Sequence, residues 1–254
     1  MIDLHSHLLP NIDDGSRSLD QSVGVLTAFA RDGITDVVLT PHLRSSQIPA
    51  KGERAIVRRD TALESLRSAA PNGVRLHAGF EIMLDEPLPP DAIGDRRYAL
   101  AGSRYYLVEF PYQIVAEFAG RVLRAIAATG VVPLVAHPER YSASTTASVG
   151  MWRDTGARVQ VDATTLMKPT GRGRLARRLV GAGLADVLAA DNHGDRRSLA
   201  RVATFLEERD AAEIIAPLMI TNPAAVLEDQ ELVGIPSTKI AERLSERVRR
   251  WLDL

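Results

Sequence analysis

The chain has 254 residues, 45% of them hydrophobic and 25% charged, which is typical of a globular protein with a substantial core. The net charge of -1 argues against a nucleic-acid-binding surface, and the absence of cysteine excludes disulfides, thiolate metal sites and cysteine nucleophiles. The sequence lacks both a signal peptide and an apolar run of about 18 residues, so we expect a cytoplasmic protein without membrane insertion.

Short apolar or β-branched runs alternate with amphipathic runs along the chain. The first kind predicts seven strands, at Ile2–His5, Asp36–Thr40, Val74–Ala78, Tyr105–Phe110, Val131–Ala136, Arg158–Asp162 and Asp186–Ala190. The second kind predicts helices at Leu19–Asp32, Val57–Ala69, Ala116–Thr129 and Arg174–Ala182. Parallel strands need crossover connections, so this alternation favours an α/β fold with a closed or nearly closed parallel barrel.

The remaining segments do not interrupt this organisation. The proline-containing stretch Glu86–Arg97 predicts a surface loop. We expect Leu199–Arg209, the TNPAAVLED segment at 221–229 and a C-terminal helix around Ile240–Leu252 to pack on the outside of the barrel. Without a linker or an internal repeat, residues 1–254 are interpreted as a single domain. Val248, Trp251 and Leu252 of the last helix could pack against a neighbouring subunit, so an oligomer is possible.

Imidazoles and carboxylates follow the carboxyl ends of almost all these predicted strands. In parallel α/β folds this edge holds the ligand site. The residues concerned are His5, His7, His42, Glu81, Glu109, His137, Asp191 and His193, which Asp13 or Asp14 in the turn after the first strand can join. The sixth histidine, His77, lies within its strand and is assigned a structural role.

Each of these residues alone is better explained as a loop residue, a hydrogen-bond partner or a surface acid. Together, at the same end of successive strands, they predict a metal site. Imidazole and carboxylate without thiolate suit manganese, iron or zinc. Nine candidate ligands are too many for one tetrahedral ion, so we expect a cluster of two or three ions that activates water for hydrolysis.

The same residues lie in motifs that resemble the PHP superfamily (polymerase and histidinol phosphatase) of metal-dependent phosphoesterases. Within it, the likeness is greatest to the bacterial manganese-dependent tyrosine-protein phosphatases of capsule and exopolysaccharide loci. The motifs are DLHSHLLPNIDDG, GITDVVLTPH, GFEI, RYYLVEFP, VPLVAHPERY and ADNH, with NPAAVL extending the likeness to about residue 228. The resemblance implies the PHP fold, a distorted, TIM-barrel-like (β/α)7 barrel.

The resemblance also implies how the ligands divide among three ions. The first ion would take His5, His7 and Asp191, with Glu81 bridging to the second. The second would take Glu109 and His137 as well. The third would take His42, His193 and an aspartate of the IDDG turn; we prefer Asp14, which directly precedes the glycine, with Asp13 as the alternative. Manganese is the expected metal, with iron or zinc as alternatives.

Arginine suits a phosphate clamp because its planar fork matches two phosphate oxygens. Arg140 in the HPERY motif is the first candidate by resemblance, and its alternative role is a surface pair with Glu139. Arg196, Arg197 and Arg44 are candidates by their proximity to predicted ligands. The chain departs from the family pattern at Asn192, at VDATTL after the sixth strand and in the loop after His42, so the departures concern the substrate more than the metal.

The implied activity is hydrolysis of phosphotyrosine in a protein, with the tyrosine-rich tail of a bacterial tyrosine kinase as the expected partner. A phenolate with a pKa of about 10 leaves more readily than an alkoxide, so a strong general acid is less necessary. The alternatives are a small-molecule phosphatase, such as one acting on histidinol phosphate, and a metal-stabilised scaffold without activity. Missing ligands would favour the scaffold, and none is missing. The near-neutral charge disfavours a nuclease.

Overall fold

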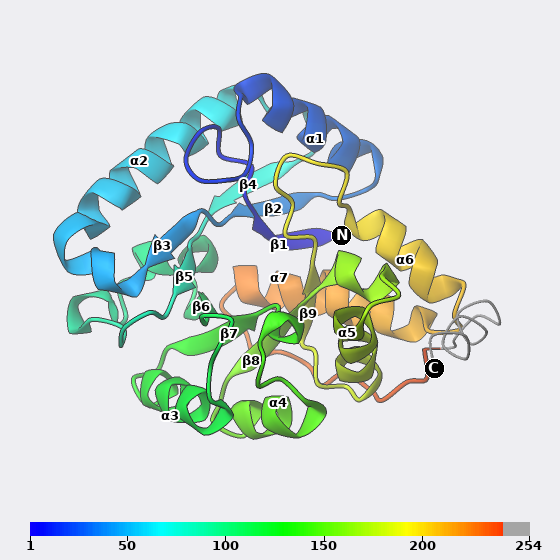
Figure 1. Cartoon of the computed structure of the whole chain (residues 1–254). Coiled ribbons are helices and arrows are strands. Elements are labelled where there is room, and N and C mark those ends of the chain that lie inside the picture. The colour runs from blue at the N-terminus through cyan, green and yellow to red at the C-terminus, as the bar shows by residue number, and fades with distance from the viewer. Residues whose placement is uncertain (241–254) are drawn as a thin grey trace.

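The computed structural model describes residues 1–240, in which short strands alternate with helices (Figure 1). The strands of these residues are β1 Ile2–Ser6, β2 Asp36–Leu39, β3 His42–Arg44, β4 Arg75–Ala78, β5 Glu81–Met83, β6 Tyr105–Glu109, β7 Val132–Ala136, β8 Arg158–Asp162 and β9 Val187–Ala189. All their pairings are parallel. Only two residues separate β2 from β3 and β4 from β5, so the strands occupy the seven predicted positions.

The strands form two sheets, in the orders β1-β2-β4 and β3-β5-β6-β7-β8-β9. Pro41 breaks the second strand position because it lacks the N–H that a ladder needs. Gly79 lies at the second break, between β4 and β5, where there is no room for a side chain because a Cβ would lie 2.9 Å from Val38 Cγ1. A parallel bridge between Ser6 and Asn192 joins β1 to the segment after β9, which closes the barrel.

Helices connect the strands and cover the outside of the barrel (Figure 1). They are α1 Leu19–Arg31, α2 Ile48–Ala69, α3 Ala116–Ala127, α4 Thr146–Arg153, α5 Gly171–Gly181, α6 Leu199–Glu207 and α7 Asn222–Leu227. The prediction was wrong about the start of α2, which lies nine residues earlier (48 rather than 57), with Pro49 in the first turn, where its missing N–H costs nothing. It also missed α4, which a capping box between Thr145 and Ser148 begins.

Two apolar clusters lie on opposite faces of the strands. Along β6, Tyr105 and Leu107 belong to one cluster, whereas Tyr106 and Val108 belong to the other. This alternation is what strand geometry requires when one face points into a barrel and the other meets the helices. The inner cluster also contains Ile2, Leu4, Val38, Leu100, Leu134, Ala136, Val187 and Val226.

The segment 221–229 is not outer packing, as the sequence suggested. It forms α7, whose Val226 belongs to the inner cluster. Asn222 is fully buried, and its polar groups are satisfied there: the amide donates to Asp186 O at 2.9 Å, and the carbonyl oxygen accepts from Val233 N at 2.8 Å. These bonds hold α7 against the barrel.

Two further predictions concern the surface and the C-terminus. The loop at 86–97 contains short 3-10 turns, and its Leu88 and Ala92 are buried, so only part of it is surface. The predicted C-terminal helix around Ile240–Leu252, with the oligomer contacts suggested for it, lies outside the described residues apart from Ile240. Among residues 1–240, no helix is both long enough and apolar enough to cross a membrane.

Candidate functional site

The side chains predicted as metal ligands gather where the barrel strands end. His5 lies in β1 and His7 directly follows it, while Glu109 is the last residue of β6. Two further ligand candidates, His42 and Glu81, are the first residues of the short strands β3 and β5, just beyond the two breaks. The others, His137, Asp191 and His193, follow β7 and β9. His77 lies apart from this group and pairs with Asp36 at 2.8 Å, in keeping with a structural role.

The most deeply buried group consists of His5, His7, Glu81 and Asp191. The Nε2 atoms of the two histidines lie 3.1 Å apart. Glu81 Oε2 lies 3.2 Å from His5 Nε2 and 3.3 Å from His7 Nε2. Asp191 Oδ1 lies 3.3 Å from each of these nitrogens. Three potential ligand atoms, from His5, His7 and Glu81, therefore surround one point, and Asp191 Oδ1 lies beside the two histidine nitrogens.

Both histidines of this group are oriented by an oxygen on the far side of the ring. His5 Nδ1 lies 3.0 Å from Gln160 Oε1, and His7 Nδ1 lies 2.7 Å from Asp13 Oδ2. An oxygen acceptor places the proton on Nδ1, which leaves the Nε2 lone pair directed at the shared point. This arrangement fits a bound cation.

Glu81 lies at the centre of the site and contacts two groups at once. Its Oε1 lies 2.7 Å from His137 Nε2, and its Oε2 lies 2.9 Å from His42 Nδ1. Oε2 is buried and has no partner in hydrogen-bonding geometry, although nitrogens of three histidines lie within 3.3 Å of it. Glu109 lies 3.4 Å from His42 Nδ1 and 3.9 Å from His137 Nε2. A carboxylate with one oxygen shared among several imidazole nitrogens and the other bonded to His137 fits a bridge between two cations.

Asp14 belongs to a third group, nearer to solvent, with His42 and His193. Its Oδ1 lies 3.3 Å from His42 Nε2 and 3.6 Å from His193 Nε2, and 70% of its side chain is exposed. Asp13 instead contacts His7 and accepts a hydrogen bond from the backbone N–H of His42 at 3.2 Å. The neighbouring aspartates of the IDDG turn thus have different surroundings, and Asp14 is the one in a position to be a ligand.

Charge in the site is strongly paired. Burial alone would lower the pKa of His42, but the adjacent carboxylates of Glu109 and Glu81 outweigh it and raise that pKa to about 10. Burial opposes ionisation of Glu81, yet nearby imidazoles, led by His5, hold its pKa well below the usual range. Glu81 is therefore anionic, and a divalent cation can replace the protons of the imidazoles around it.

Two buried carboxyls outside the predicted set support the strand ends. Asp3 Oδ1 accepts hydrogen bonds from the backbone N–H of Ala190 at 3.1 Å and of His5 at 3.3 Å, and burial raises the pKa of Asp3 to about 7. Glu139 Oε1 accepts from the N–H of Asp162 at 2.9 Å, and burial raises its pKa to about 8. Glu139 is thus not a surface partner of Arg140, which was the alternative role considered for that arginine.

Two candidate ligands have a left-handed backbone that side chains rarely adopt. His137 has a φ of 32° and Asp191 a φ of 48°. Such a conformation costs on the order of 1–3 kcal/mol in a residue other than glycine, and it persists where the surroundings enforce it. His137 directly follows β7 and Asp191 comes two residues after β9, so the turns at these strand ends point their side chains into the site.

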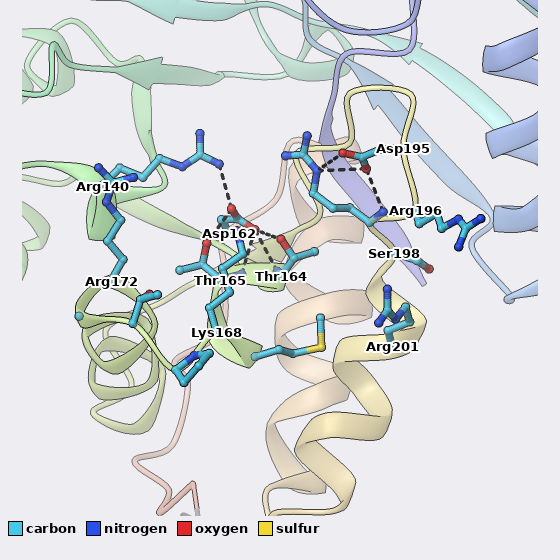
Figure 2. A pocket seen from close by; sticks show the side chains of 15 residues that line it. Arg140, Asp162, Thr164, Thr165, Lys168, Arg172, Asp195, Arg196, Ser198 and Arg201 are labelled. Carbon is cyan, nitrogen blue, oxygen red and sulfur yellow. Dashed lines mark hydrogen bonds and ion pairs between the residues drawn. The ribbon is translucent and has the colours of Figure 1, made fainter. Parts of the chain in front are cut away.

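Two of the candidate arginines reach the predicted ligands. Arg140 donates to Asp191 and, at 2.9 Å, to Asp162 Oδ2, and Arg197 Nη1 lies 3.5 Å from Asp191 Oδ2. Arg44 instead pairs with Asp85 at 3.7 Å. Arg196 lies on the wall of an adjoining pocket (Figure 2) and, within residues 1–240, forms no ion pair with a predicted ligand.

Asp162 is a site residue that sequence reasoning missed. It is buried at the end of β8, and its carboxylate accepts from the hydroxyls of Thr164 and Thr165, both at 2.8 Å, as well as from Arg140. The VDATTL segment was noted only as a departure from the family pattern. The rule that identified the other residues, a polar side chain at the end of a parallel strand, also applies to Asp162.

Gly15 allows the IDDG turn to approach β1 closely. A Cβ at this position would lie 2.0 Å from His7 O and 2.4 Å from His7 Cβ. Gly15→Ala is therefore expected to displace the turn from His7 and to weaken divalent-metal binding by about 10–100-fold, as loss of support for a ligand does. Titration calorimetry with Mn²⁺ measures this.

Gly24→Ala in α1 provides a matched control, because a Cβ there would meet no atom within 4 Å. We expect it to raise the free energy of unfolding by about 0.5–1 kcal/mol, the helix preference of alanine over glycine, and to leave metal affinity unchanged. If Gly15→Ala also left the affinity for Mn²⁺ unchanged, the IDDG turn would not be what positions His7.

Comparison with known proteins identifies the family. Residues 1–228 match the family described as "Capsular polysaccharide synthesis, CpsB/CapC". The chain belongs to the CpsB/CapC family. Two curated relatives are called tyrosine-protein phosphatases: YwqE of Bacillus subtilis, 27% identical over 96% of this chain and 98% of YwqE, and CpsB of Streptococcus pneumoniae, 27% identical over 91% of this chain and 99% of CpsB.

Solved structures confirm the predicted barrel fold of this CpsB/CapC family member. A structure reported for YwqE and CpsB, "unique metal-dependent tyrosine phosphatases", superposes with a TM-score of 0.77 at 24% identity and covers 95% of this chain and 100% of its own. Dihydropyrimidinase from Brevibacillus agri shares the fold with a TM-score of 0.54 at 14% identity, covering 94% of this chain and 73% of its own.

Proposed function

We propose that this CpsB/CapC protein is a metal-dependent tyrosine-protein phosphatase that acts in the cytoplasm in capsule or exopolysaccharide regulation. The observation that carries the proposal is a set of three overlapping ligand groups, two of which share Glu81, beside the guanidinium groups of Arg140 and Arg197. Its family and the names of its full-length relatives support the substrate class.

The residues present fit two or three divalent ions, with manganese preferred and iron or zinc as alternatives. Bound ions would supply an activated water and hold phosphoryl oxygens. His5, His7 and Asp191 would hold one ion and share Glu81 with the next. Glu109 and His137 would complete the second set, and Asp14, His42 and His193 would form the third.

The arginines have the chemistry for binding the phosphoryl group. Arg140 and Arg197 both reach Asp191, so their guanidinium groups border the metal-ligand cluster. A guanidinium fork donates to two phosphoryl oxygens and stabilises the charge that grows on them during transfer. Arg196, without such a contact, is better placed for the part of the substrate that lies outside the phosphate site.

The proposed substrate is a phosphotyrosine protein, for which the tyrosine-rich tail of a bacterial tyrosine kinase is the candidate. A direct test measures kcat/KM of the Mn²⁺-loaded protein on a phosphotyrosyl peptide, the matched phosphoseryl peptide and histidinol phosphate. We expect the phosphotyrosyl peptide to be the best substrate. Faster turnover of histidinol phosphate would overturn the assignment in favour of a small-molecule phosphatase, and no turnover of any substrate would favour a scaffold.

Removal of the metal is expected to abolish this activity. Dialysis against a chelator should lower turnover of the phosphotyrosyl peptide by about 10³-fold or more, because the ions supply several kcal/mol of transition-state stabilisation. It should also lower Tm, since a ligand that binds only the folded state stabilises it. Mn²⁺ added back should restore both, whereas full activity in protein shown by elemental analysis to lack metal would contradict the proposal.

A further inference from the structure

A cavity of about 1300 Å³ lies beside the metal-ligand cluster. Its walls come from the segments that follow β8 and β9, including the first residues of α5 and α6 (Figure 2). Arg140 and Arg197 line its inner part and also contact Asp191. The cavity is therefore continuous with the proposed phosphate site.

The cavity has an excess of positive charge without partners. Lys168 and Arg172 lie on one wall, and Arg196 and Arg201 lie on the other (Figure 2). Within the described part of the chain, none of these four forms an ion pair; Arg172 only packs over the ring of Tyr112, at 5.8 Å.

The acidic side chains of the lining do not neutralise these four cations. Asp162 is already bonded to Arg140 at 2.9 Å, and Asp195 is bonded to Arg197 at 2.8 Å. The unpaired cations are also exposed, so they are available to a ligand that enters from solvent.

Two helices begin at the same cavity. Thr170 caps α5 and Ser198 caps α6, and both residues line the cavity. Each cap satisfies one backbone N–H, of Gly173 and of Ala200 respectively. The other N–H groups of a first helical turn have no partner within the helix, and this end of a helix carries partial positive charge. Both helix ends therefore add to the field of the four cations.

We propose that this cavity binds the acidic side chains that flank phosphotyrosine in the substrate, and so selects for carboxylate-rich sequences. This inference rests on the proposed phosphatase function. A phosphate held by Arg140 and Arg197 would leave the adjoining peptide along the cavity, between the two cationic walls. A phosphate ester alone needs neither this volume nor four further cations, whereas a peptide with aspartate or glutamate beside the phosphotyrosine pairs with them.

The test compares phosphotyrosyl peptides with neutral or acidic flanks on the Mn²⁺-loaded full chain. The unsubstituted protein should show a KM about tenfold lower for the acidic peptide at low salt, which corresponds to about 1.4 kcal/mol, and the advantage should shrink as salt screens it. In the double variant Arg172→Ala/Arg201→Ala, the KM for the acidic peptide should rise about tenfold. The kcat for both peptides and the KM for the neutral peptide should change less than about twofold. Arg201→Glu should reduce the preference for the acidic peptide more than Arg201→Ala does, because it adds a repulsive charge as well as removing a cation.

Arg54→Ala is the matched control, because it removes an exposed arginine from α2, on the opposite side of the barrel from α5 and α6 (Figure 1). Equal KM values for both peptides in the unsubstituted protein, or an equal effect of Arg54→Ala, would overturn the inference but leave the phosphatase function standing. If KM falls only for a peptide in which a second phosphotyrosine provides the flanking negative charge, the cavity does not select for carboxylates, and the inference is overturned. Hydrolysis of neither peptide would instead count against the proposed function itself.

Discussion

Glu81→Gln is expected to lower kcat/KM on a phosphotyrosyl peptide by about 10³-fold or more, the largest effect of any single substitution in the site. The side chain is fully buried, and its two oxygens contact nitrogens of His5, His7, His42 and His137. An amide has no negative charge and cannot bridge two cations, so the substitution removes a ligand from two ion sites at once.

The effect should appear in metal content as well as in rate. Elemental analysis of the purified variant is expected to show the loss of at least one ion per chain, and added Mn²⁺ should raise its Tm less than that of the unsubstituted protein. Glu64→Gln in α2 makes the same chemical change on a side chain that is 73% exposed, and it should alter neither property. Full metal content in Glu81→Gln, together with normal turnover, would contradict the role of Glu81 as a ligand of two ions.

The barrel was predictable because most of its strands are four or five residues long and contain apolar or β-branched side chains. β6 and β7 each span five residues, with apolar side chains on both faces. β3 and β5 have only three residues each, and they begin with His42 and Glu81, so no apolar run indicates them. Tertiary pairing with neighbouring strands forms these two strands, and local preference does not.

The ligand set was predictable for a geometric reason. Parallel strands end at one edge of a barrel, so residues far apart in sequence that follow strands meet there. The separate roles of Asp13 and Asp14 were not predictable, since they differ by one position within a single turn. The cationic cavity was not predictable either, because Lys168 precedes α5 and Arg201 lies in α6, and only the folded chain brings these two segments together.

Arg140→Lys is expected to lower kcat/KM by about 10²-fold, with most of the loss in kcat, and to leave metal content unchanged. Removing one preorganised donor from a transition state typically has an effect of this size. Lysine retains the charge but cannot donate in parallel to two phosphoryl oxygens. Arg44→Ala is the control, because that exposed arginine pairs with Asp85 outside the ligand cluster. An equal loss in the control, or a change in KM alone, would contradict a role for Arg140 in the transition state.

Asp162→Asn tests how Arg140 is held in place. The carboxylate of Asp162 is fixed by Thr164 and Thr165 and accepts from Arg140, so its substitution should loosen the guanidinium while its own side chain touches no phosphate. We expect a smaller loss of kcat/KM, about tenfold. Because Asp162 would act through Arg140, the kcat/KM of the double variant Asp162→Asn/Arg140→Lys should be little lower than that of Arg140→Lys alone. Losses that multiply in the double variant would show that Asp162 acts independently, through the end of β8 instead of through the arginine.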